Sequence, residues 1–107
     1  MKDREAVEFL KSILSIYSPS GEEEPLAHYL AESLEKHGLQ ASIDEVGNVI
    51  AAPSNPIPDE PELIFLGHID TVPGFIPVRE EGGKIFGRGA ADAKGPMAAF
   101  LVAMLRV

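Results

Sequence analysis

The chain has 107 residues, and its 17 acidic and 9 basic side chains give a formal charge of −8 without a single cysteine. The absence of cysteine excludes a disulfide scaffold and a thiolate metal site. The acidic balance argues against nucleic-acid binding, which depends on Lys and Arg neutralising phosphates. No apolar run of about 18 residues is present for membrane insertion. We therefore expect a globular, cytoplasmic protein with neither a nucleic acid nor a membrane as partner.

Two amphipathic helices are predicted first. Apolar residues recur at three- and four-residue spacing from Asp3 to about Tyr17, and Ser18-Pro19 ends this pattern because the residue before proline leaves the helical region. The second helix extends from near Ser20 to His37. Its regular part is expected to begin about one turn later, since Pro25 cannot donate a backbone hydrogen bond. Gly38 is a suitable left-handed end.

Extended segments follow these helices. Leu39–Ile43 alternates apolar and polar residues, which is typical of a half-exposed strand, and Val46–Ile50 predicts a turn entering another strand. Pro53–Pro61 contains four prolines and is expected to be a surface loop. Leu63–Leu66 is a continuous apolar run, which predicts a strand covered on both faces.

The last third predicts a hairpin and a helix. Val78–Glu80 and Lys84–Phe86 flank a glycine-rich turn. Pro96–Val107 has helical character but is apolar on every side, so it needs cover from neighbouring structure. We interpret residues 1–107 as the N-terminal portion of a longer catalytic domain. The alternative is a non-catalytic α/β interaction module that self-associates through this apolar helix.

Two short motifs carry the candidate chemistry. His68 and Asp70 stand two positions apart at the end of the predicted Leu63–Leu66 strand, so their side chains share one face. Asp70 is thus able to fix the tautomer of His68 and leave the other ring nitrogen for a metal. The simpler alternative is that both residues cap a strand end through backbone hydrogen bonds.

The second motif is the glycine-rich segment Gly87–Pro96, which surrounds Asp92 with small residues. A phosphate loop is excluded because Gly95-Pro96 follows Lys94 where Ser or Thr is required, and a dinucleotide fingerprint is excluded because Asp92 occupies a glycine position. Asp92 as a simple helix cap remains the alternative. Together with His68, however, Asp92 makes half of a zinc site, and its carboxylate is suited to bridging two metals.

The remaining histidines and acidic clusters are predicted to be surface residues. They are Glu22–Glu24, Glu80-Glu81, His28 and His37.

Four ordered motifs resemble the N-terminal part of the zinc-dependent exopeptidase and deacylase family, which includes acetylornithine deacetylase, succinyl-diaminopimelate desuccinylase, aminoacylase and glutamate carboxypeptidase. The branch most similar to this chain releases lysine or ornithine from an amino-group carrier protein, or deacetylates N-acetyl-lysine. A short, tryptophan-free stretch between Pro73 and Gly87 favours this branch, as does Ala93 where many relatives carry methionine. The four motifs are Ser18–Glu23, Gly47–Val49, Gly67–Pro73 and Gly87–Gly95.

The resemblance implies specific roles. His68 would be a ligand of one metal, Asp92 the carboxylate that bridges two zinc ions, and Asp70 the catalytic residue that orients His68. Cobalt would be an alternative metal, and the peptide bond after Asp92 is expected to be cis. The general base and the remaining ligands would lie later in the longer protein, so we expect this chain alone to be inactive.

The resemblance also implies a fold and a substrate class. We expect an α/β fold, with a three-layer arrangement of a mixed, largely parallel sheet and flanking helices, incomplete in this chain. The metal centre would lie at the carboxyl ends of the strands. The longer protein would be a homodimer acting on a small amino-acid amide or a carrier-protein conjugate, in lysine or arginine biosynthesis. A related deacylase or dipeptidase with another substrate is the remaining alternative.

Overall fold

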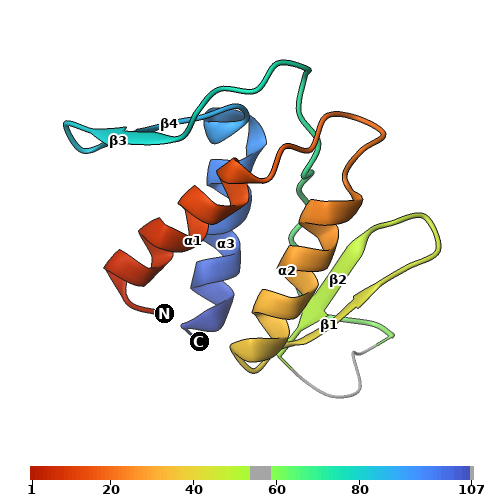
Figure 1. Cartoon of the computed structure of the whole chain (residues 1–107). Helices are drawn as coiled ribbons and strands as arrows, with labels where there is room; N and C mark the ends of the chain where they lie inside the picture. Colours follow the sequence, from red (N-terminus) through yellow and green to blue (C-terminus); the bar gives the residue numbers. More distant parts are fainter. Residues whose placement is uncertain (54–58, 107) are drawn as a thin grey trace.

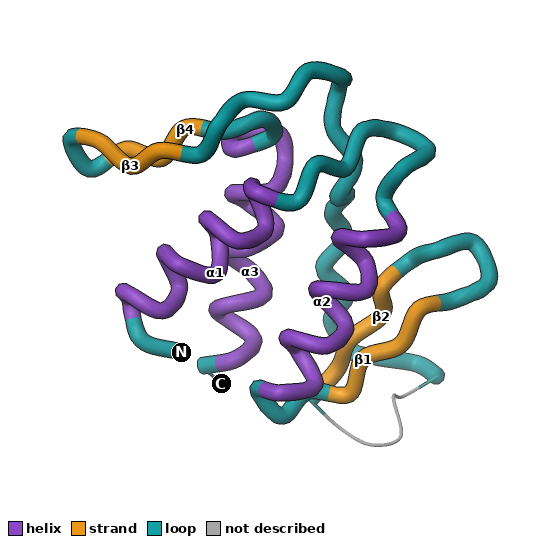
Figure 2. The backbone as a smooth tube through the Cα atoms, viewed as in Figure 1, coloured by secondary structure: helices purple, strands orange, loops and turns teal. Residues whose placement is uncertain are grey.

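The computed structural model describes residues 1–53 and 59–106. Three α-helices, a short π-type helical turn and two antiparallel hairpins make up its regular structure (Figures 1 and 2). In chain order they are α1 (Asp3–Ser15), α2 (Glu24–Lys36), β1 (Gln40–Ile43), β2 (Val49–Ala52), β3 (Arg79–Glu81), β4 (Lys84–Phe86), η1 (Ala90–Lys94) and α3 (Gly95–Leu105).

The three helices enclose the core. Helix α1 packs against α3, while α2 covers the β1–β2 hairpin, and the β3–β4 hairpin projects away from this body (Figure 1). The first and last residues of the described chain lie close together, because Arg106 binds the Met1 carbonyl and the Asp3 carboxylate. The buried core residues are Phe9, Ile13, Leu26, Leu30, Leu34, Leu39, Met97, Ala98, Leu101 and Val102.

Both predicted N-terminal helices are present with shorter bounds. Helix α1 ends at Ser15, two residues before the predicted end, because Ile16 already has extended backbone angles. Helix α2 begins at Glu24, with Pro25 in its first turn, as expected from the missing amide hydrogen of proline. Gly38 has a φ of +93°, which is the left-handed conformation predicted for the helix end.

The two hairpins agree with the predicted extended segments. Strand β1 pairs with β2 so that Ile43 faces Val49, and the Asp44 carboxylate accepts backbone hydrogen bonds from Val46 and Asn48 in the turn between them. Strand β2 continues to Ala52, two residues beyond the predicted segment. Strands β3 and β4 form the second hairpin.

The prediction of a buried strand at Leu63–Leu66 is wrong for the described structure. This segment forms no ladder, and its side chains are 54–89% exposed. A strand requires a neighbour to accept its backbone hydrogen bonds, and none lies alongside this segment in residues 1–53 and 59–106. Within this segment, the ring of Phe65 stacks on the ring of Phe100 in α3, with centroids 5.5 Å apart.

The largely parallel sheet is likewise not formed within the described residues. Both of their sheets are two-stranded and antiparallel, and the parallel pairing consists of one isolated bridge between Pro19 and Thr71. The chain therefore has a mixed α and β composition that is compatible with an α/β domain. Residues 54–58 of the predicted Pro53–Pro61 loop lie outside the described residues.

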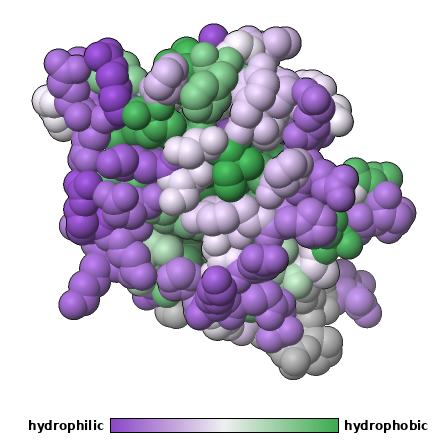
Figure 3. All heavy atoms as spheres, viewed as in Figure 1, coloured by the Kyte–Doolittle hydropathy of each residue, from purple (hydrophilic) through white to green (hydrophobic). Residues whose placement is uncertain are grey.

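Helix α3 confirms the predicted C-terminal helix and buries one side of it. Met97, Ala98, Leu101 and Val102 enter the core, whereas Ala99 and Ala103 are exposed. Val107 lies outside the described residues. None of the helices that the structure describes is long and apolar enough to span a bilayer. The molecular face in Figure 3 is mainly hydrophilic, with separate apolar patches between polar side chains.

Truncation of the core should destabilise the protein. Leu30 is 2% exposed at the centre of α2, so Leu30→Ala is expected to lower the free energy of unfolding by about 2–5 kcal/mol through lost burial and a residual cavity. Urea unfolding of both proteins measures the difference. The matched control is Val46→Ala, because Val46 is 76% exposed in the β1–β2 turn and its loss should change stability by less than about 0.5 kcal/mol. Equal effects of the two substitutions would contradict this core assignment.

Candidate metal centre

The candidate site is built on a segment that pairs with the chain just after α1. The Thr71 amide donates to the Ser18 carbonyl at 2.9 Å, and the Ser20 amide donates to the Thr71 carbonyl at 3.2 Å. The Ser18 hydroxyl, which is fully buried, donates to the Ile69 carbonyl at 2.7 Å. These three bonds hold the backbone on both sides of Asp70 in a fixed position.

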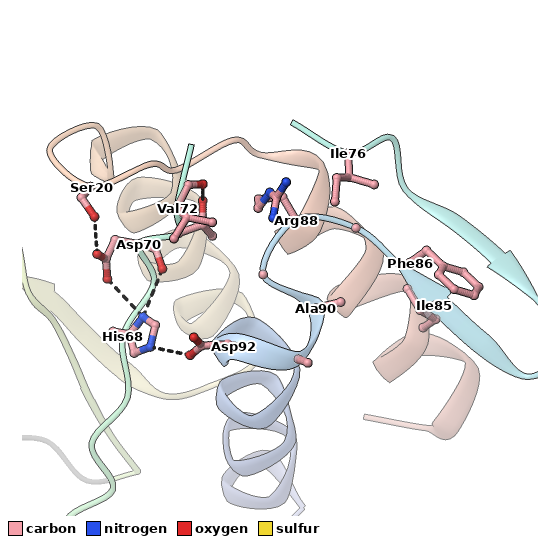
Figure 4. A pocket seen from close by; sticks show the side chains of 14 residues that line it. Ser20, His68, Asp70, Val72, Ile76, Ile85, Phe86, Arg88, Ala90 and Asp92 are labelled. Carbon is pink, nitrogen blue, oxygen red and sulfur yellow. Dashed lines mark hydrogen bonds and ion pairs between the residues drawn. The ribbon is translucent and has the colours of Figure 1, made fainter. Parts of the chain in front are cut away.

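His68 lies between the two aspartates (Figure 4). Its Nδ1 is 3.1 Å from both the carbonyl oxygen and Oδ1 of Asp70, and its Nε2 is 3.1 Å from Oδ1 of Asp92. The sequence predicted that His68 and Asp70 share one face and that Asp92 joins them from a separate loop. The structure brings all three side chains together.

Two glycines of the Asp92 loop, Gly89 and Gly95, lie too close to neighbouring atoms to carry a Cβ. Gly89 has a φ of +85°, and a Cβ there would lie 2.7 Å from Cγ2 of Thr71. A Cβ on Gly95 would lie 2.2 Å from the carbonyl oxygen of Ala90. The peptide bond between Asp92 and Ala93 is cis, as the family resemblance implies. Small residues in this motif therefore let the loop bring Asp92 to His68.

Lys94 anchors the same loop and was not among the predicted site residues. Its side chain is buried, and Nζ donates hydrogen bonds to the carbonyl oxygens of Ile13 at 3.1 Å and Ile16 at 2.9 Å. Burial lowers the pKa of Lys94 to about 8. The sequence contains only a weak signal for this role, because Lys94 is a single lysine among small residues. The carbonyl groups that accept its hydrogen bonds lie about 80 positions earlier in the chain.

Ser20 is a second residue that the sequence did not single out. Its hydroxyl donates to Oδ2 of Asp70 at 2.6 Å, and this bond lowers the pKa of the Asp70 carboxyl by stabilising its ionised form. The hydrogen bond from the His68 ring to the Asp70 carbonyl in turn raises the pKa of His68. Ser20, Asp70 and His68 thus form one hydrogen-bonded series that ends at Asp92.

The site borders an open cavity of about 570 Å³. Polar groups line one part of it, and Ile76, Ile85 and Phe86 form an apolar wall (Figure 4). The Asp92 side chain is 90% exposed and the His68 side chain 50% exposed, so both are accessible to a ligand. The polar residues that line the cavity are Ser20, His68, Asp70, Thr71, Arg88 and Asp92.

The donor atoms present fit part of a zinc site. A neutral imidazole nitrogen and a carboxylate oxygen are both zinc ligands, and two ligands on one tetrahedral zinc lie roughly 3.3 Å apart for bonds of about 2.0–2.1 Å. The 3.1 Å between His68 Nε2 and Asp92 Oδ1 is close to this value. Within residues 1–53 and 59–106, however, no three His, Asp or Glu side chains are grouped to hold a metal.

The other histidines and acidic clusters lie away from the cavity. Glu80 pairs with Arg4 and Lys11 on the surface. His28 is 3.5 Å from Glu24, and His37 binds the Ser33 carbonyl one turn earlier in α2. These positions agree with the expectation that they are surface residues.

Removal of the Ser20 hydroxyl should raise the pKa of Asp70. With a lowered folded-state pKa, Asp70 favours folding above its unfolded pKa, and this contribution is lost as the pH falls through the folded value. In Ser20→Ala the folded-state pKa of Asp70 should move toward its unfolded value, so this contribution should be smaller and its loss complete at a higher pH. Carbon-13 NMR titration of the Asp70 carboxyl in the metal-free protein measures the shift. Ser15→Ala is the control, since the Ser15 hydroxyl donates to the Lys11 carbonyl of its own helix. An unchanged Asp70 titration in Ser20→Ala would refute the role of Ser20.

Comparison with known proteins gives a family match and several similar relatives. Residues 64–107 match the model of peptidase family M20/M25/M40. Three relatives are similar over nearly the whole chain. A Pyrococcus furiosus protein provisionally named as a LysW-lysine/LysW-ornithine hydrolase is 50% identical over 94% of the chain. The LysW-lysine hydrolase of Deinococcus radiodurans is 42% identical over 92%, and the LysW-lysine/LysW-ornithine hydrolase of Sulfurisphaera tokodaii is 40% identical over 94%. The chain spans 27–30% of the length of these curated relatives.

Proposed function

We propose that the protein carrying this chain is a two-metal amidohydrolase of peptidase family M20/M25/M40, the family whose model residues 64–107 match. Its substrate is lysine or ornithine joined through an amide to an amino-group carrier protein, or to a small acyl group. Relatives named as LysW-lysine and LysW-ornithine hydrolases support this substrate class. Both predicted metal-ligand motifs fall inside the matched residues.

The observation that carries the proposal is the convergence of His68 and Asp92. Their donor atoms lie 3.1 Å apart at the edge of a cavity, although 24 positions separate them in the chain. A lone hydrogen-bonded pair would need no support from neighbouring residues. Here the Ser18–Thr71 pairing holds one partner and Lys94 holds the loop of the other. Such support is typical of a site that must keep its geometry.

The residues of this chain have separate roles in the proposed reaction. His68 Nε2 and the Asp92 carboxylate would hold zinc, with cobalt as an alternative, and the second carboxylate oxygen of Asp92 would be available to a neighbouring ion. When bound, the metal acts as a Lewis acid and lowers the pKa of water. Asp70 contacts His68 Nδ1 through its carbonyl and carboxylate oxygens, which leaves Nε2 directed at Asp92, where the metal would bind. Ser20 keeps the Asp70 carboxylate in this orientation.

We extend the proposal to the fold of the longer protein. Leu63–Leu66 is apolar and exposed in this chain, so a neighbouring strand and helix outside residues 1–107 would cover it as an inner strand of a largely parallel sheet. The remaining metal ligands and the general base belong to that part, as does a dimerisation domain. Exposed apolar runs of this kind are unfavourable unless another element covers them.

Substitution of the proposed ligands should abolish activity in the protein that carries this chain. His68→Ala and Asp92→Ala are expected to lower kcat/KM for release of lysine from the carrier conjugate or from N-acetyl-lysine by more than about 100-fold, and Asp70→Asn by about 10–100-fold. His28→Ala is the matched control, because His28 is exposed on α2 and outside the cavity. Chelation should remove activity, and zinc or cobalt should restore it. Full turnover by Asp92→Ala would show that the assignment is wrong.

The isolated chain should bind zinc weakly and show no turnover. Two donor groups, His68 and Asp92, are grouped in the described residues, and two metal sites require more ligands than these. Isothermal titration calorimetry of the 107-residue chain measures the affinity, after circular dichroism has established that it is helical. Two tight zinc sites in this chain would contradict the proposal that further ligands come from elsewhere.

A further inference from the structure

Among the interactions of residues 1–53 and 59–106, Arg88 differs from the other three arginines in its lack of an acidic partner. Arg4 pairs with Glu8 and Glu80, Arg79 with Glu81, and Arg106 with Asp3. Arg88 has no carboxylate within salt-bridge distance in the part of the chain that the structure describes. This is notable in a chain with a formal charge of −8, where acidic side chains outnumber basic ones by 17 to 9.

The position of Arg88 relates this free charge to the candidate site. Arg88 follows β4 and the glycine at position 87, and its half-buried side chain lines the same cavity as His68 and Asp92 (Figure 4). Its Nε donates to the carbonyl oxygen of Gly74, which fixes the direction of the guanidinium. The terminal nitrogens, Nη1 and Nη2, keep their hydrogen-bond donors for another partner.

The surroundings indicate the chemistry of that partner. Asp70 and Asp92 would repel an anionic group from their part of the cavity, so the place for such a group is the Arg88 guanidinium. Ile76, Ile85 and Phe86 form an apolar wall of the same cavity. A fixed guanidinium binds a carboxylate through two parallel hydrogen bonds. A ligand with a carboxylate beside an alkyl chain therefore satisfies both parts of this cavity.

We propose that Arg88 binds the free carboxylate of the amino-acid portion of the substrate, next to the amide that is cleaved. The identity of that amide rests on the proposed function, whereas the carboxylate preference of the cavity rests on Arg88 itself. The purely structural alternative is that Arg88 only holds the loop at Gly74. Because a loop support acts on every substrate alike, a pair of ligands that differ only in charge separates the two roles.

The experiment uses the zinc-loaded, full-length protein with N-acetyl-lysine and its neutral carboxamide, N-acetyl-lysinamide. The wild type should prefer the carboxylate by about 10- to 100-fold in kcat/KM, the size expected for hydrogen bonds to a charged group. In Arg88→Gln this preference should fall to within about threefold. Arg88→Lys keeps the positive charge but lacks the planar guanidinium that donates two parallel hydrogen bonds, so it should retain an intermediate preference. Lys84→Gln removes an equal charge from β4, outside the cavity lining, and should leave the preference unchanged.

Several outcomes would overturn the proposal. An unchanged preference in Arg88→Gln would show that another group, such as the metal, holds the carboxylate. Equal losses for both compounds in the two Arg88 variants would show that Arg88 only supports the loop. A wild type without any preference would show that the cavity does not select an anion.

A calorimetric measurement separates this proposal from the proposed function. If the wild type hydrolyses neither compound, the proposed substrate class is wrong, and the dissociation constants of the two compounds then report on Arg88 directly. Tighter binding of N-acetyl-lysine that disappears in Arg88→Gln supports the carboxylate site. Equal binding of the two compounds to the wild type, or binding of neither, refutes it.

Discussion

The C-terminal end of α1 is the point on which the candidate site depends. Its carbonyl groups at Ile13 and Ile16 accept two hydrogen bonds from the buried ammonium of Lys94. Burial of a lysine is costly unless its hydrogen bonds are satisfied. The Ile13 carbonyl also accepts a hydrogen bond from the Ile16 amide, and the negative end of the helix macrodipole favours the positive charge of Lys94. The Lys94 side chain therefore attaches the loop that carries Asp92 to the C-terminal end of α1.

The same helix end also positions the other half of the site. Two residues after Ile16 the chain reaches Ser18, which pairs with Thr71 and binds the Ile69 carbonyl, and Ser20 then binds the Asp70 carboxylate. The segment that carries His68 and the loop that carries Asp92 are thus both held by hydrogen bonds to the end of α1 or to the residues just after it. A displacement of α1 would move both segments together, which maintains the 3.1 Å contact between their donor atoms.

The helices and hairpins could be predicted from the sequence because local physics determines them. The three-and-four spacing of apolar residues predicted α1, and the missing amide of Pro25 predicted the later start of α2. The i, i+2 spacing of His68 and Asp70 predicted a shared face. Leu63–Leu66 failed as a strand for the opposite reason, since pairing depends on a partner that a local pattern does not contain.

The sequence by itself determined which groups were available for chemistry: one histidine beside an aspartate, and one aspartate among glycines. Only the tertiary structure decided that they meet, and that Lys94, Ser20 and Arg88 belong with them. The partners of these three side chains lie 81, 50 and 14 positions away for the contacts to Ile13, Asp70 and Gly74. Side-chain spacing along a helix or strand predicts contacts over a few residues. Contacts over longer separations exist only when the packing of α1 and α3 brings distant segments together.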